Sequence, residues 1–284
     1  MKLRDQTLTT LMGKAQRQAL RSQKHLWQRL NLNPDEKTPL FVLGSQRSGT
    51  TMLMKVLEKS RYMRVFQEHS RRAFQGNFRL MPPEVIRGLI DASHAPAVVF
   101  KPLCDAHLTD QLLETYAPAK AVWIFRDYHD VANSAVNKWN THLKDVMRDI
   151  SEGNWDALDW RGERLGEENI ALVRRLYSPE MTPQEAASVQ WYLRNQFYFA
   201  LGLDENPRVL LMRYEDLVLE PEAEIRRLFD FVDVPFEPQI IADVTDRSIG
   251  KGSNLELSPA IEHVCAGMLQ RLNETYEAKV TAGQ

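Results

Sequence analysis

A chain of 284 residues with 43% hydrophobic and 26% charged residues has the composition of an ordinary globular protein. Its formal net charge of -2 gives no overall field that would draw it to nucleic acid or to an anionic membrane. The two cysteines, Cys104 and Cys265, exclude a disulfide framework and are expected to be buried free thiols, with a single bridge between them as the alternative. We therefore expect a cytoplasmic protein that binds any anionic ligand through local basic groups.

Residues 1–36 are expected to form an N-terminal helical extension. They are basic and loosely amphipathic, and they contain no apolar run long enough for a signal peptide or a transmembrane segment. A helix packed on the protein surface fits this pattern, and so does a helix that binds a membrane surface or a second subunit. Residues 37–284 are expected to form a single domain.

Short apolar runs bounded by polar residues predict parallel strands, at residues 37–43, 65–69, 97–101, 121–125 and 208–212. Helical patterns lie between or after them, at residues 51–60, 105–116, 130–147, 182–201 and 221–231. This alternation predicts an α/β fold, a P-loop-like three-layer domain with a central parallel sheet flanked by helices on both faces.

Residues 151–178 depart from this alternation because they are mostly polar, with Trp155 and Trp160 among charged side chains. We expect a polar insertion over the carboxyl edge of the sheet, where ligands bind in such folds. A solvated pair of helices explains the same composition.

Residues 44–51, Gly-Ser-Gln-Arg-Ser-Gly-Thr-Thr, directly follow the first strand and open a helix, as in a phosphate-binding loop. Glycines let backbone N–H groups converge on an anion, and the helix N-terminus adds its dipole. The residues expected to bind phosphate here are Gly44, Gln46, Arg47, Ser48, Gly49, Thr50 and Thr51. An ATP- or GTP-cleaving protein would carry lysine at Thr50, so a P-loop kinase or NTPase acting on a small molecule is the disfavoured alternative.

The run from Arg47 to Thr51 resembles the 5′-phosphosulfate loop of sulfotransferases, which use 3′-phosphoadenosine 5′-phosphosulfate (PAPS). A second motif, Arg126 at a strand end with Ser134 eight residues later, is similar to the family's 3′-phosphate site. Arginine offers a planar charged fork, and Lys138 lies on the same helical face as Ser134. In the alternative interpretation, Arg126 simply pairs with Asp127, with Asp130 or with a helix C-terminus.

Two further segments resemble the family. Tyr214, at the end of the last strand, corresponds to a tyrosine that commonly lies near the nucleotide, although a simple strand-to-helix junction explains it as well. Lys251 lies where cytosolic sulfotransferases carry an Arg-Lys-Gly segment, but this chain lacks that arginine. Ser258, after Asn254, is closer to an active-site serine of the tyrosylprotein type, or it is a helix N-cap before Pro259.

Glu68, expected at the end of the second strand, resembles the glutamate base of tyrosylprotein and glycosaminoglycan-type sulfotransferases rather than the histidine base of the cytosolic type. His69 has a suitable ordinary pKa, but strand neighbours point to opposite faces, so only one of the two faces the pocket. In a third possibility, Glu68 and His69 both face solvent and pair with arginines 71 and 72. Lys101 before Pro102 resembles the family's strand-end lysine, or it is a snorkelling surface lysine.

The resemblance therefore implies a PAPS-dependent sulfotransferase that needs no metal. Glu68 would deprotonate a hydroxyl (or amine) of the acceptor, while Arg47 and Lys101 would stabilise the developing charge. A sugar, a peptide tyrosine, a lipid and a small metabolite all fit as acceptors. The tryptophans that would either stack on such an acceptor or belong to the core are Trp139, Trp155, Trp160 and Trp191. A binding protein that has lost its chemistry is the remaining rival.

Overall fold

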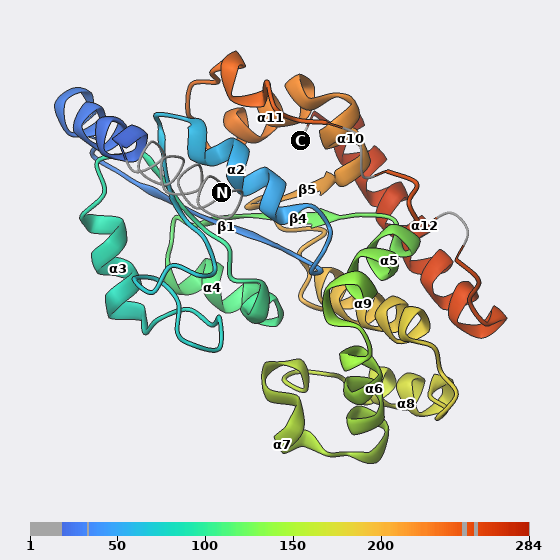
Figure 1. Ribbon diagram of the computed structural model, residues 1–284. Helices are drawn as coiled ribbons and strands as arrows, with labels where there is room; N and C mark the ends of the chain where they lie inside the picture. Colours follow the sequence, from blue (N-terminus) through green and yellow to red (C-terminus); the bar gives the residue numbers. More distant parts are fainter. Residues whose placement is uncertain (1–18, 33, 246–248, 253–254, 284) are drawn as a thin grey trace, which may run out of the picture.

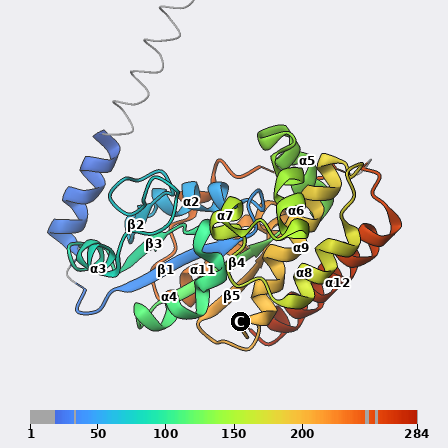
Figure 2. The ribbon, with the colours of Figure 1, turned by 90° about the horizontal axis from the view of Figure 1, so that it is seen from below.

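The computed structural model describes residues 19–32, 34–245, 249–252 and 255–283 (Figure 1). Of the predicted N-terminal extension, residues 1–18 lie outside the described part, and residues 19–31 form a helix. Gln28 Nε2 of this helix donates to the carbonyl oxygen of Arg61 at 2.8 Å, and the Trp27 and Tyr62 rings meet edge to face. The helix is thus packed on the surface beside the second strand, at the end of the molecule opposite the C-terminal helix (Figure 2).

The sheet has five parallel strands in the order β2-β3-β1-β4-β5. They are β1 Thr38–Gly44, β2 Met63–Phe66, β3 Ala97–Phe100, β4 Lys120–Phe125 and β5 Val209–Arg213. β1 lies at the centre, with Leu40 opposite Val99 of β3 and Gly44 opposite Ile124 of β4. The loop after β1 and the residues after β4 therefore emerge side by side at the carboxyl edge, where ligands bind in sheets of this kind.

Helices cover both faces of the sheet, as predicted. They are α2 Thr50–Lys59, α3 Pro83–Asp91, α4 Thr109–Thr115, α5 Tyr128–Trp139, α6 His142–Glu152, α7 Trp155–Leu158, α8 Glu167–Leu176, α9 Pro183–Ala200, α10 Tyr214–Leu219, α11 Pro221–Phe231 and α12 Pro259–Thr281, with 3₁₀ turns η1 Leu103–Leu108, η2 Asp159–Arg161 and η3 Pro238–Ile241. Phe41 and Trp123 face the core shared with α5, α9 and α12, whereas Val42 and Val122 face the core shared with α2 and α11. Alternate residues of each strand thus build the two cores.

Two predicted helices differ from the structure. Residues 130–147 form parts of α5 and α6 because the chain breaks at Asn140, whose φ of 52° lies in the left-handed region that asparagine tolerates. Residues 105–116 form η1 followed by α4. The capping box predicted at the start of α9 is confirmed, since Thr182 Oγ1 accepts from the Glu185 N–H and the Glu185 carboxylate accepts from the Thr182 N–H.

Residues 151–178 span the end of α6, then α7, η2 and α8, and α6, α7 and α8 lie together below α9 in Figure 1. This segment is less polar inside than its composition indicates, since Leu158, Ile170 and Val173 are buried. Trp160 is buried as well, whereas Trp155 is 43% exposed. No helix in the described part of the chain is long and apolar enough to span a membrane.

Candidate active site

The loop between β1 and α2 owes its shape to two glycines with left-handed backbone angles. A Cβ at Gly44, with φ 124°, would lie 2.2 Å from the carbonyl oxygen of Ile124 in β4. A Cβ at Gly49, with φ 90°, would lie 2.1 Å from Cδ2 of Tyr214. Arg47 between them also has a positive φ, of 72°, which a non-glycine residue rarely adopts. The backbone of the loop is therefore fixed by close contacts with β4 and with Tyr214.

Side chains of the loop reach in two directions. Arg47 Nε donates to Ser134 Oγ of α5 at 3.0 Å, and Thr51 Oγ1 accepts from Lys101 Nζ at 3.0 Å. Inside the loop, the buried hydroxyls of Ser45 and Ser48 lie 2.6 Å apart. Gln46 is half-buried, and Thr50 is buried at the first position of α2. The loop thus links the region after β4 to the region after β3.

Arg126 follows β4 directly, and its side chain is buried. One guanidinium nitrogen lies 2.9 Å from Asp130 Oδ2, so the pairing named as an alternative is present. The guanidinium also lies over the ring of Tyr214, with Cζ 4.5 Å from the ring centre. The indole N–H of Trp191 donates to the Arg126 carbonyl oxygen at 3.0 Å. These contacts orient Arg126 between Tyr214, Asp130 and the core.

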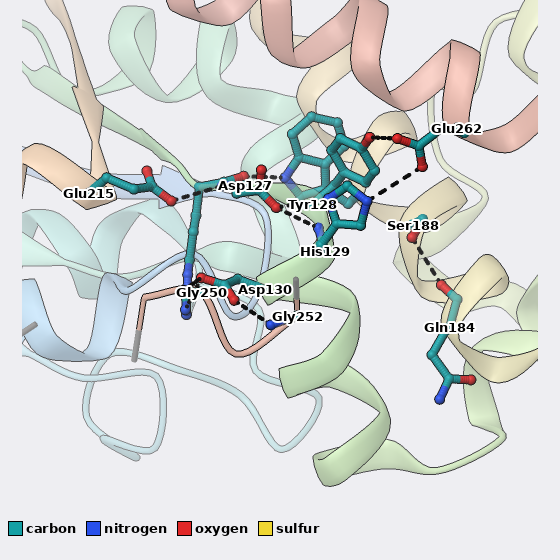
Figure 3. Close-up of polar contacts among 12 residues, drawn as sticks. Asp127, Tyr128, His129, Asp130, Gln184, Ser188, Glu215, Gly250, Gly252 and Glu262 are labelled. Carbon is teal, nitrogen blue, oxygen red and sulfur yellow. Dashed lines mark hydrogen bonds and ion pairs between the residues drawn. The ribbon is translucent and has the colours of Figure 1, made fainter. Parts of the chain in front are cut away.

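Asp130 ties the start of α5 to residues 249–252, as Figure 3 shows. Its carboxylate accepts from the N–H of Gly250 at 2.9 Å and of Gly252 at 2.8 Å. Burial alone would raise the pKa of Asp130, but the hydrogen bonds from Arg126 and from these two N–H groups outweigh it and lower the pKa. A Cβ at Gly252 would lie 2.3 Å from the His129 carbonyl, so a larger residue does not fit there. This carboxylate therefore holds the Lys251 backbone beside α5.

Asp127, three residues before Asp130, forms hydrogen bonds at the start of α5 (Figure 3). Asp127 is the N-cap, and its carboxylate accepts from the His129 N–H at 2.8 Å. The N–H of Asp127 itself donates to Glu215 at 3.1 Å. These bonds leave Asp127 in a capping role.

A cavity of about 290 Å³ lies among these elements. Its lining residues are Arg47, Arg126, Asp130, Asn133, Ser134, Asn137, Lys138 and Lys251. Four of these side chains are cationic and one is a carboxylate, so the cavity is suited to an anion in a chain that is acidic overall. The structure thus brings together five residues that the sequence predicted for phosphate binding. It adds Asp130, Asn133 and Asn137, which the sequence reasoning did not place in the site.

Lys101 and Glu68 meet on the other side of the loop. Lys101 directly follows β3, and its side chain is 2% exposed, so the snorkelling alternative is wrong. Its Nζ lies 3.3 Å from Glu68 Oε1 as well as 3.0 Å from Thr51 Oγ1. Burial lowers the pKa of Lys101, although the nearby Glu68 carboxylate opposes this shift. A buried ammonium is therefore fixed between a carboxylate and the phosphate loop.

The reasoning that separated Glu68 from His69 needs a correction. β2 ends at Phe66, and both residues lie in the turn that follows, so strand alternation does not apply to them. Glu68 is paired with Lys101 rather than with the neighbouring arginines, and His69 is exposed. The two residues are thus distinguished by the pairing of Glu68 with the buried Lys101 and by the exposure of His69, not by strand alternation.

Ser258 is not among the lining residues of the cavity. It is exposed at the N-cap position of α12 before Pro259, and its N–H donates to Glu185 Oε1 at 3.0 Å. Ser258 thus occupies the N-cap position without a capping hydrogen bond from its side chain, and Asn254 lies outside the described residues. Within the described chain, no group of three or more His, Cys, Asp or Glu side chains is arranged to hold a metal ion.

Comparison with known proteins gives one family match and a set of similar folds. The sulfotransferase domain from the curacin biosynthetic pathway has a TM-score of 0.57 at 17% identity, covering 84% of this chain and 98% of that one. A sulfotransferase from Alicyclobacillus acidocaldarius has a TM-score of 0.47 at 17% identity, covering 86% and 96%. A mouse sulfotransferase in complex with PAP, adenosine 3′,5′-bisphosphate, has a TM-score of 0.41 at 12% identity, covering 84% and 74%. No curated protein sequence matches.

The structural likeness at these identities concerns the fold alone. The family assignment rests on the sequence, because the family model described as the sulfotransferase domain matches residues 37–258. That match includes the phosphate loop, Glu68, Lys101, Arg126, Ser134 and Tyr214. The chain belongs to the sulfotransferase domain family.

Proposed function

We propose that this protein transfers the sulfuryl group of PAPS to a hydroxyl of its acceptor, with Glu68 as the base. The observation that carries the proposal is the position of the phosphate loop. On one side Arg47 contacts Ser134 at the cationic cavity, and on the other Thr51 contacts Lys101, which is paired with Glu68. A nucleotide held in the cavity would place its 5′ end on the loop, between the two groups of residues.

The residues of the cavity fit the 3′-phosphate of PAPS. Arg126 and Ser134 supply a guanidinium and a hydroxyl, and Lys138 and Lys251 add positive charge at the same cavity. The ring of Tyr214 stacks against the guanidinium of Arg126. The 5′-phosphosulfate fits the N–H groups and hydroxyls at the start of α2, where the helix dipole favours negative charge.

The reaction then needs a base and a cation, which Glu68 and Lys101 supply. Glu68 takes the proton of the acceptor hydroxyl as its oxygen bonds to sulfur, and the bond from sulfur to the bridging phosphate oxygen breaks. Lys101 and Arg47 stabilise the negative charge that develops on the leaving phosphate. The products are the sulfated acceptor, PAP and one proton. With Glu68 in this role, the protein would be a glutamate-base sulfotransferase.

The acceptor carries a hydroxyl (or amine), as in a sugar, a peptide tyrosine, a lipid or a small metabolite. We expect the enzyme to act in the cytoplasm, where the buried free thiols of Cys104 and Cys265 stay reduced.

The test is a transfer assay with ³⁵S-labelled PAPS and a panel of hydroxyl-bearing acceptors, run beside a magnesium–ATP hydrolysis assay. We expect labelled product and release of PAP, without turnover of ATP. Magnesium-dependent ATP hydrolysis by a protein that does not bind PAP would refute the proposal and support the kinase or NTPase alternative.

A further inference from the structure

Two arginines, one from η2 and one from α9, lie against a single buried indole. Trp160, in η2, is 4% exposed. The guanidinium carbon of Arg161 lies 4.4 Å from the centre of this indole, and that of Arg194, from α9, lies 4.9 Å from it. Trp160 therefore contacts two positive charges, one on the next residue in the chain and one on the distant helix α9.

Arg194 is a buried charge without a carboxylate partner. Its side chain is 2% exposed, one terminal nitrogen donates to the Leu103 carbonyl oxygen at 3.0 Å, and its buried Nε has no hydrogen-bond partner. Among the described residues, neither Arg161 nor Arg194 forms an ion pair with a carboxylate. A buried charge without such a partner is costly, so its retention calls for a functional reason.

Among the described residues, the carboxylates whose charge acts on these arginines are Asp159 for Arg161 and Asp105 for Arg194, and neither forms an ion pair with its arginine. Asp105 accepts from Arg79 Nε and from the Leu80 N–H, each at 2.8 Å. Glu163 pairs with the same Arg79 and lies 2.7 Å from His107 Nε2. Asp105 and Glu163 are therefore both paired with Arg79 rather than with Arg161 or Arg194.

Burial affects the titration of the groups around this pair. It lowers the pKa of Arg194 to about 10, so the guanidinium still carries its charge near neutrality. It also lowers the pKa of Arg161 and raises that of the Cys104 thiol to about 12. Cys104 is therefore an uncharged thiol and does not neutralise either arginine.

The two arginines lie beside the catalytic pair of the proposed mechanism. The Leu103 carbonyl that accepts from Arg194 is two residues beyond Lys101. The Cys104 side chain lies close enough to Arg194, Asp105, Arg161 and Glu68 for all four charges to act on it. An acceptor whose hydroxyl is at Glu68 would thus extend past Cys104 toward the indole.

We propose that Arg161 and Arg194 bind a negatively charged group of the acceptor, a carboxylate or a phosphate, while its hydroxyl lies at Glu68. Guanidinium groups bind such anions through paired hydrogen bonds, and the Trp160 indole holds both guanidinium groups in place. The assignment rests on the proposed function, because Glu68 defines the acceptor side. It narrows the acceptor class to hydroxylated acids and phosphates.

The experiment measures binding to protein saturated with PAP, so that no turnover is needed. The probes are matched pairs, titrated by ligand-observed NMR: hydroxyphenylacetate and hydroxyoctanoate against their methyl esters, and glycerol phosphate against glycerol. The acid pairs and the phosphate pair distinguish the two sources of charge. We expect the charged member of at least one pair to bind about 10 to 100 times more tightly, as for hydrogen bonds between charged groups.

Arg161→Gln should remove this preference and leave the affinity for PAP unchanged. Arg161 is half-buried in a short 3₁₀ turn, so its substitution leaves the core intact. Arg194→Gln should have the same effect if thermal melting shows that it folds. The matched control is Arg175→Gln, which removes the same charge from the exposed face of α8 and should keep the preference.

No charge preference in any pair, or a preference that survives in Arg161→Gln, would overturn the proposal. Calorimetry with PAP is run first on each protein. A wild type that does not bind PAP would count against the proposed function, whereas normal binding of PAP without a charge preference would count against this inference alone.

Discussion

The two sides of the phosphate loop are built in different ways. On the nucleotide side, Asp130 holds Arg126 and the Gly250 and Gly252 backbone together, so the cations of the cavity are organised around one carboxylate. On the acceptor side, Arg161 and Arg194 share an indole without a carboxylate. The nucleotide side is therefore organised by the protein itself, whereas the acceptor side has positive charge that a ligand would neutralise.

The largest effect that separates the two sides is expected from Glu68→Gln. This change keeps the size of the side chain but removes the base, so the rate of transfer should fall by about 10²–10⁴. The affinity for PAP should not change, because Glu68 is not among the lining residues of the nucleotide cavity. Steady-state kinetics and calorimetry measure the two quantities.

His69→Gln is the matched control for Glu68→Gln, since the neighbouring side chain is exposed. It should retain the rate of the wild type. Full activity of a folded Glu68→Gln protein would exclude Glu68 as the base, and loss of activity only in His69→Gln would assign that role to the histidine.

A smaller effect, confined to the nucleotide side, is expected from Gly252→Ala. The added Cβ would lie 2.3 Å from the His129 carbonyl, so the backbone around Lys251 must move away from α5. Losing one charged contact of this kind should weaken binding of PAP about tenfold. Calorimetry measures it, with Gly267→Ala as the control, since a Cβ there meets no atom within 4 Å. Equal affinity of both variants for PAP would show that Lys251 does not contribute to the nucleotide site.

The smallest effect concerns pH on the acceptor side. Burial lowers the pKa of Lys101, and the side chain must be protonated to stabilise the leaving phosphate. The rate should therefore fall as pH rises through a pKa below the ordinary lysine value of about 10.4. In Lys101→Arg the side chain keeps its charge at high pH. The fall in rate at alkaline pH should therefore begin at a higher pH in this variant, whatever its absolute rate. An identical fall in both proteins would mean that another group is responsible.

The grouping of residues around the cavity was largely predictable because its features are local. The glycine spacing of residues 44–51 and the short distance from Arg126 to Ser134 can be read within single strand-loop-helix units. Asp130 was named only as a partner of Arg126, since its other partners, Gly250 and Gly252, lie some 120 positions further along the chain.

The acceptor side was harder to predict because distant segments build it. α9 was predicted correctly with its capping box, but nothing local shows that Arg194 is buried against η1 and Trp160. The break at Asn140 was missed because neither glycine nor proline marks it. The boundary between the N-terminal extension, residues 1–36, and the domain that follows stays a prediction.

The central claim is that the cavity beside Arg126 binds the 3′-phosphate of PAPS. Calorimetry of the wild type and of Arg126→Ala with PAP and with 5′-AMP, which lacks that phosphate, tests it most directly. We predict that the wild type binds PAP about 10 to 100 times more tightly than AMP, and that Arg126→Ala loses this difference. Equal affinity of the wild type and Arg126→Ala for PAP would contradict the assignment.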